Sequence, residues 1–141
     1  MIEQITVFLE NDKGRLAALC RVMGDAQISM HALTVADTSQ YGVVRIIADT
    51  PAKAYEILSE QGFRVSLTKV IAVEVSDAAG SLADMLEILG EENVNVEYAY
   101  CFSVAGDKAV DVLRVSDPET ARVALEKSDF RLLGPEELYV N

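Results

Sequence analysis

The sequence is poor in the residues that build catalytic, metal-binding and disulfide-stabilised sites. Its 141 residues include one histidine, two cysteines and three prolines, and aromatic side chains make up only 6%. No run of 18 uncharged apolar residues occurs, so we expect no membrane-spanning segment. Cys20 and Cys101 have no third cysteine near them, and the histidine is distant in sequence, which argues against a zinc site. We expect both cysteines to be buried free thiols.

Basic residues are also scarce, and the acidic excess is unevenly distributed. Twelve Lys and Arg side chains stand against 23 Asp and Glu, for a net charge of −11. Residues 1–70 carry seven basic and eight acidic side chains, whereas residues 71–141 carry five and fifteen. Nucleic acid binding needs a basic surface, so nucleic acid is excluded as a partner. Because residues 1–4 form neither a basic nor an apolar leader, we expect a cytoplasmic protein that does not bind membranes.

What the sequence does contain is an internal repeat, built on apolar residues that make up half of the chain. A shift of 66 places residues 11–16 over residues 77–82, and a shift of 67 superposes the later parts of the two copies. The one-residue change falls in a predicted turn, where an insertion costs least. We therefore divide the chain into two copies of one unit, residues 1–69 and residues 70–141.

Each copy has the pattern of a βαββαβ unit. Alternating apolar residues predict a first strand, and Asn11 or Asp12 is expected to cap the helix that follows. Thr50, followed by proline, is expected to cap the second helix of the first copy, and Asp117 that of the second. The apolar stripes expected to face the core are Leu16, Leu19, Cys20 and Met23, and Leu82, Met85, Leu86 and Leu89.

This order of elements predicts the fold class. Right-handed crossovers put both helices of a unit on one face of a four-stranded antiparallel sheet. We therefore predict an α+β protein with two tandem ferredoxin-like βαββαβ units. We expect their antiparallel sheets to be joined side by side, with the helices on one face.

Motifs of known enzyme classes are missing. The sequence contains no GxSxG, HExxH or GxxxxGK[ST] motif. His31, Tyr98 and Tyr100 are the candidates for an acid or base, but residues of these types within strands more often serve packing. We therefore predict no catalytic residues, no cofactor and no metal site, and a protein that is not an enzyme.

The strand-to-helix turn that occurs in both copies is the most informative feature. It reads Asn11-x-x-Gly14-x-Leu16 in the first copy and Asp77-x-x-Gly80-x-Leu82 in the second. Glycine permits a tight turn and a close ligand, and the free N–H groups of a helix start favour a carboxylate. The Asn or Asp offers an acceptor to an ammonium group. Together these groups suit a free α-amino acid; a helix that merely follows a glycine turn is the alternative.

With this turn in a tandem βαββαβ pattern, each copy resembles an ACT domain, a small module that senses amino acids. Gln27-Ile28-Ser29-Met30 and Asn93-Val94-Asn95-Val96 are similar to the family's G/N-[IV]-N-[IV] pattern. The resemblance covers essentially the whole chain, which is similar to tandem ACT proteins without an attached enzyme.

The copies depart from the family pattern to different degrees. Ser29 stands where the second copy keeps the family's asparagine as Asn95. Gln27 stands where glycine or asparagine would adopt a left-handed conformation more readily. The turn at residues 77–82 is therefore the better match, whereas Arg15 adds a cation for an anionic ligand group in the first copy.

The resemblance also implies where a ligand binds. In the family, two units pair through their second strands, and the ligand lies at the seam between the glycine turn of one unit and the second strand of the other. The residues implied in the first copy are Asn11, Asp12, Gly14, Arg15, Leu16, Ile28, Ser29 and Met30. Those in the second copy are Asp77, Ala79, Gly80, Ser81, Leu82, Asn93, Val94 and Asn95.

These observations favour a regulatory or sensor protein that binds a free amino acid and has no catalytic activity. The alternatives are a protein–protein regulatory module that needs no ligand and a small ferredoxin-like enzyme. The apolar surface left on two small units predicts a homodimer. An enzyme that the protein regulates is a further expected partner.

Overall fold

The computed structural model of the chain describes residues 1–37, 40–76, 78–103 and 108–138. The elements of its first half are β1 (Ile2–Glu10), α1 (Arg15–Asp25), β2 (Met30–Asp37), β3 (Tyr41–Ala48), α2 (Pro51–Glu60) and β4 (Arg64–Ser76). Those of its second half are α3 (Ser81–Glu91), β5 (Val96–Ser103), β6 (Lys108–Val115), α4 (Pro118–Lys127), β7 (Arg131–Leu133) and α5 (Pro135–Leu138).

The chain folds as two units. The N-terminal unit consists of Glu3–Thr68 together with Leu138, and the C-terminal unit consists of Lys69–Glu137 together with Met1–Ile2. Strand β4 is continuous through this boundary, so its residues 64–68 belong to the first unit and its residues 69–76 to the second. One strand thus closes the first copy of the repeat and opens the second.

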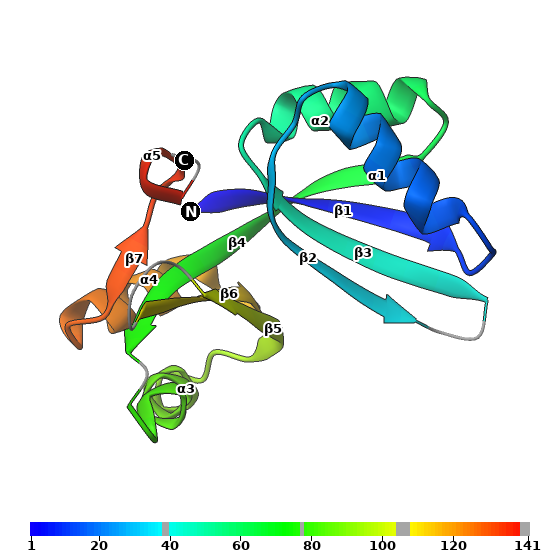
Figure 1. The fold of residues 1–141 in the computed structure, drawn as a ribbon. Coiled ribbons are helices and arrows are strands. Elements are labelled where there is room, and N and C mark those ends of the chain that lie inside the picture. The colour runs from blue at the N-terminus through cyan, green and yellow to red at the C-terminus, as the bar shows by residue number, and fades with distance from the viewer. Residues whose placement is uncertain (38–39, 77, 104–107, 139–141) are drawn as a thin grey trace. The chain divides into compact units, whose positions relative to one another are not determined.

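In the N-terminal unit, α1 and α2 cover the same face of the sheet (Figure 1). Strand β3 pairs in antiparallel fashion with β1 and with β2, and β1 lies next to β4. The hydroxyl groups of Thr6 and Thr68 are hydrogen-bonded across β1 and β4 at 2.9 Å. The core between helices and sheet consists of Ile5, Val7, Leu9, Leu19, Met23, Ile28, Val44, Ile46, Ala48, Ala54, Leu58 and Phe63.

The C-terminal unit repeats this arrangement with α3 and α4 on one face of its sheet. Strand β6 pairs in antiparallel fashion with β5 and with β4, and the short β7 pairs with β4. Its core consists of Ile71, Val73, Val75, Met85, Leu89, Val94, Leu113, Val115, Ala121 and Leu125. The predicted fold class, α+β with two βαββαβ units, is confirmed.

The predicted helix stripes are only half correct. Leu19 and Met23 of α1 are fully buried, and so are their counterparts in α3, Met85 and Leu89. The other half of each stripe is not in the core: Leu16, Leu82 and Leu86 are exposed and Cys20 is half-buried. Because residues four apart form one row along a helix, the buried pairs form one row and these residues form the row beside it. The second row lies at the rim of each core.

Left-handed backbone follows the first helix of each unit. Gln27 has a φ of +58° and Asn93 a φ of +59°. The sequence-based expectation of a left-handed residue at Gln27 is therefore confirmed. This conformation costs an ordinary L-residue about 1–2 kcal/mol, whereas glycine and asparagine tolerate it better.

The first prediction concerns this strain. Gln27→Gly is expected to stabilise the protein by about 0.5–1 kcal/mol, because relief of the left-handed strain exceeds the added entropy of the unfolded chain. Asn93→Gln, the matched change in the other copy, is expected to destabilise it. Urea denaturation followed by circular dichroism measures both effects. A less stable Gln27→Gly variant would contradict the prediction.

Candidate ligand-binding site

Both strand-to-helix turns contain glycine in the same left-handed conformation. Gly14 has φ 86° and ψ −8°, and Gly80 has φ 87° and ψ −7°. In the C-terminal turn the N–H of Ser81 donates to the carbonyl oxygen of Ala78 at 3.2 Å, and the N-terminal turn has the equivalent bond at 3.3 Å. Two copies of the repeat have therefore kept one turn geometry.

Helices α1 and α3 begin without a side-chain cap. The prediction that Asn11 or Asp12 caps α1 is wrong, because Gly14 occupies the capping position and has no side chain. Gly80 takes the same position before α3, and no side chain of the described residues caps that helix either. The first N–H groups of a helix have no intrahelical acceptor, and with the helix dipole they favour an anion.

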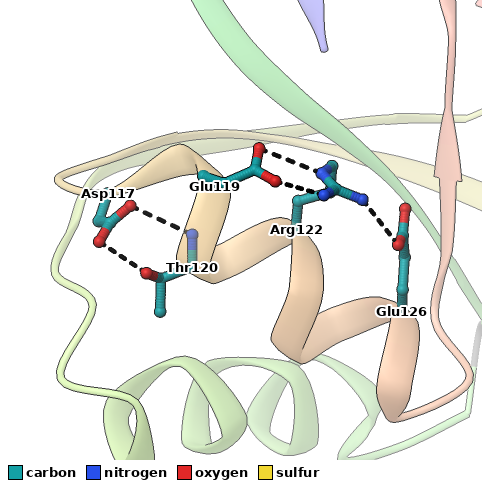
Figure 2. A network of polar contacts seen from close by, with 5 residues as sticks. All are labelled: Asp117, Glu119, Thr120, Arg122 and Glu126. Atoms are coloured by element: carbon teal, nitrogen blue, oxygen red, sulfur yellow. Dashed lines mark hydrogen bonds and ion pairs between the residues drawn. The ribbon is translucent and has the colours of Figure 1, made fainter.

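The second helix of each unit begins differently. Thr50 precedes α2 as predicted, but its hydroxyl donates to Oδ1 of Asp49 at 3.2 Å instead of capping the helix. Asp117 does cap α4: its carboxylate accepts from the backbone N–H of Thr120 at 3.1 Å and from its hydroxyl at 2.7 Å (Figure 2). These hydrogen bonds hold the pKa of Asp117 below its ordinary value, and the bond from the Thr120 hydroxyl has the larger effect. Helix α4 therefore has no open anion site of the kind at α3.

A cleft of about 250 Å³ opens beside the Gly80 turn within the C-terminal unit. The end of β4, the turn, the start of α3 and the neighbouring strands β5 and β6 provide its lining: Val75, Ser76, Ala78, Gly80, Leu82, Cys101, Ala109 and Asp111. This volume is below that of pockets for drug-sized ligands, and it suits a small metabolite. Two predicted site residues, Gly80 and Leu82, thus lie together on a cleft.

Asp111 is the buried acidic residue of this cleft. Its exposed fraction is 4%, and its Oδ2 accepts no hydrogen bond from any described residue. Cys101 lies directly opposite on β5, and the Asp111 carboxylate is among the causes that raise the pKa of its thiol. Burying a carboxylate without a full set of hydrogen bonds is costly, so such a group calls for a functional explanation.

Sequence reasoning missed both Cys101 and Asp111. The prediction that the cysteines are buried is wrong, since Cys20 is half-buried and Cys101 is exposed on β5, which pairs only with β6 among the described strands. A signal was present in the repeat, because the shifts of 66 and 67 align Cys101 with Val35 and Asp111 with Val44. An acid that replaces an inward-facing valine of the other copy marks a position that packing alone does not explain.

Asn93, Val94 and Asn95 lie at the other end of α3 from the Gly80 turn. At 1.5 Å per residue the 11-residue helix is about 16 Å long, so these residues do not reach the Gly80 cleft. Val94 is buried in the core. The backbone N–H of Asn95 donates to the hydroxyl oxygen of Ser116 at 3.0 Å, and the carbonyl oxygen of Asn95 accepts from the backbone N–H of Ser116 at 2.9 Å. The predicted seam, which would combine a turn of one unit with the second strand of the other, stays a prediction.

The remaining site residues predicted in the second copy surround the turn. Ala79 is exposed, and Ser81 lines a second cavity, of about 400 Å³, together with Arg131. Arg131 pairs with Glu74 at 2.9 Å, so its charge is compensated. Asp77 lies outside the described residues.

In the N-terminal unit the predicted residues again divide between the two ends of a helix. Those that are exposed are Asn11, Asp12, Gly14 and Leu16 at the turn, and Ser29 and Met30 beyond the far end of α1. Ile28 is part of the core. Nε of Arg15 lies 2.9 Å from Oε2 of Glu10, and its guanidinium lies 4.9 Å from the ring centroid of Phe63. The cation expected to attract an anionic ligand group thus already has an acidic partner.

Within residues 1–37, 40–76, 78–103 and 108–138, no three His, Cys, Asp or Glu side chains are grouped so that they would hold a metal ion. None of the helices in those ranges is long and apolar enough to cross a membrane.

The second prediction concerns the Cys101 thiol. Partial desolvation, followed by the hydrogen bond to Asp111 and its negative charge, raises the pKa of Cys101 to about 11. At pH 8 about 0.1% of it is therefore thiolate, so alkylation by iodoacetamide is expected to be slow. In a Cys20→Ser background, Asp111→Asn is expected to lower this pKa and accelerate alkylation. Mass spectrometry over a series of pH values measures the rate, and a midpoint near 9 in the parent would contradict the prediction.

Comparisons with known proteins agree with this description. The ACT domain pair family matches residues 1–139. Protein BT0572 from Bacteroides thetaiotaomicron, known from a crystal structure, is 32% identical in sequence to this chain, with a TM-score of 0.93. The alignment covers 99% of this chain and 96% of that protein's chain. No curated protein matches the sequence.

More distant structures share the fold. The regulatory subunit of aspartate kinase from Thermus thermophilus is 17% identical, with a TM-score of 0.64 and 88% of each chain covered. That from Thermus flavus is 15% identical, with a TM-score of 0.61, and the alignment covers 89% of this chain and 90% of that one. Because the ACT family match extends over nearly the whole length, this chain belongs to the family of ACT domain pairs.

Proposed function

We propose that this protein is a regulatory sensor that binds a free amino acid at the Gly80 cleft and has no catalytic activity of its own. The observation that carries the proposal is the uncapped start of α3, which opens on a cleft of metabolite size. The fold shared with the aspartate kinase regulatory subunits supports a role in regulation.

The lining of the cleft suits an amino acid for chemical reasons. The first-turn N–H groups of α3 would bind the α-carboxylate, because they are donors at the positive end of a helix dipole. Val75, Leu82 and Ala109 add apolar surface against which an aliphatic part of the ligand would pack. The glycine keeps the backbone of the turn accessible, since no heavy atom lies within 4 Å of the position of a Cβ at Gly80.

The enzyme alternative finds less support. Tyr98 and Tyr100 alternate with Cys101 along β5, so their side chains point to the sheet face opposite the cleft. His31 belongs to β2 of the other unit. None of these three candidates is among the described lining residues of the Gly80 cleft. A protein–protein module without a ligand stays the main alternative, and the ligand screen below separates it from a sensor.

The proposal also includes a homodimer and an enzyme that the protein regulates. Strand β2 pairs only with β3 among the described strands, and its exposed residues include Met30, Leu33 and Val35. An apolar, unpaired strand edge favours pairing with another chain. We expect a homodimer by light scattering after size-exclusion chromatography, and a monomer for Val35→Lys. A monomeric parent protein would contradict this part.

The third prediction is that at least one standard amino acid raises the melting temperature. A ligand at 100 times its Kd adds about 2.7 kcal/mol of stability, enough for a shift of several degrees. Each of the twenty L-amino acids is tested separately at millimolar concentration by differential scanning fluorimetry. If none stabilises the protein, the ligand-independent module replaces the sensor.

The fourth prediction places the binding site. Gly80→Val is expected to abolish the stabilisation, because a β-branched residue disfavours the φ of +87° and the turn would rearrange. Gly14→Val is the matched control, since Gly14 has the same conformation and equally open surroundings. It is expected to lose similar stability and keep ligand binding, with both far-UV spectra unchanged. The opposite pattern would move the site to the N-terminal unit.

A further inference from the structure

The two copies differ chemically at one pair of facing strand residues. In the N-terminal unit Val35 of β2 lies directly opposite Val44 of β3, and Val44 is fully buried. In the C-terminal unit Cys101 of β5 lies opposite Asp111 of β6 in the same place. The valine pair shows that the fold needs only apolar side chains here. A carboxylate at this position therefore requires another reason.

The surroundings of Asp111 supply too few hydrogen bonds. On the β4 side its register partner is Val73, which is fully buried and part of the core. On the β5 side Cys101 is its register partner, and Oδ2 of Asp111 has no hydrogen-bond donor among the described residues. Besides β4 and β5, Asp111 also adjoins the Gly80 cleft, because it is one of the residues that line it. The torsion that turns a carboxylate has broad minima, so a small rotation would present this oxygen to a ligand there.

We infer that Asp111 binds the primary ammonium group of a small ligand in the Gly80 cleft, so that the C-terminal unit alone carries this site. The inference rests on the proposed function for the ligand's carboxylate and deepens it by naming the group that Asp111 recognises. An ammonium group has three donors, and its hydrogen bonds to a carboxylate are charge-assisted.

The charges next to the cleft narrow the ligand class further. Asp111 is a buried carboxylate in the lining of the cleft, so a second negative charge on the ligand is disfavoured there. Asp84, in the first turn of α3, adds a negative charge close to the helix start. The ligand class is therefore an amino acid with a neutral or basic side chain, or an amine that lacks the carboxylate.

Isothermal titration calorimetry with matched variants tests the inference. The probes are the twenty L-amino acids, ethylammonium chloride and sodium propionate. A probe that binds the parent is expected to bind Asp111→Asn about 10- to 100-fold more weakly, the range for a hydrogen bond to a charged group. Glu87→Gln removes an exposed carboxylate from the same unit and is expected to leave the affinity unchanged. Glutamate and aspartate are expected to bind least.

A second variant separates lost binding from lost folding. The double change Cys101→Val and Asp111→Val copies the pair of the N-terminal unit, and it is expected to melt at or above the parent temperature while binding is lost. Chemical shifts of the Gly80, Cys101 and Ala109 amides in the parent would report a ligand in the cleft.

The outcomes distinguish this inference from the proposed function. An amino acid that binds Asp111→Asn as tightly as the parent would overturn the inference and leave the sensor function standing. Binding of ethylammonium alone, lost in Asp111→Asn, would support the inference and remove the amino acid as the ligand. If no probe binds, or if only propionate binds, the inference fails.

Discussion

The left-handed glycine at the strand-to-helix turn is the constraint on which each unit depends. The chain leaves β1 or β4 and must reverse at once into a helix that lies on the same sheet, and both turns do so with φ near +87° at Gly14 and Gly80. A residue with a Cβ pays about 1–2 kcal/mol for that conformation. Glycine removes this cost, but it also removes the side chain that would cap the helix. The glycine that permits the turn thus leaves the first N–H groups of the helix without a cap from that residue.

Duplication has conserved the packing of the units and changed the rim of one core. Leu19 and Met23 of α1 have direct counterparts in Met85 and Leu89 of α3, all of them fully buried. Beside these matching cores, the first copy has the pair Val35–Val44 where the second has Cys101–Asp111. Replacing apolar residues by a buried, incompletely bonded carboxylate lowers stability, so stability does not explain the change. Departures of this kind from local consistency are typical of functional sites.

Much of the fold was predictable because it depends on local patterns. The internal repeat, the helical spacing of Leu19 and Met23, and the left-handed residue at Gln27 all follow from short stretches of sequence. The exposure of Leu16 and Leu82 could not be predicted in this way, because helical spacing alone does not show where a helix extends beyond the sheet it covers.

The candidate site was less predictable because it depends on contacts between distant segments. Gly80 and Leu82 carry a motif and were found from it. Asp111 reaches the same cleft only through the register of β6 against β4 and β5, which places it between Val73 and Cys101. Strand register is a property of the folded sheet, and a shift of one residue would turn the Asp111 side chain to the other face.

Magnitudes decide which charges matter to a ligand at the Gly80 cleft. Glu87 and Glu91 are exposed on α3, and Glu119 and Glu126 are exposed partners of Arg122 (Figure 2). An exposed ion pair contributes at most about 1 kcal/mol to stability. At physiological salt, electrostatic interactions between exposed charges are largely screened beyond about 8 Å. Glu91 is eleven helical residues from Gly80, about 16 Å away, and lies beyond this range. Asp111 is buried beside the cleft, where screening is weak. Asp111 would therefore influence recognition of the proposed ligand more than most of the exposed acidic residues of the unit.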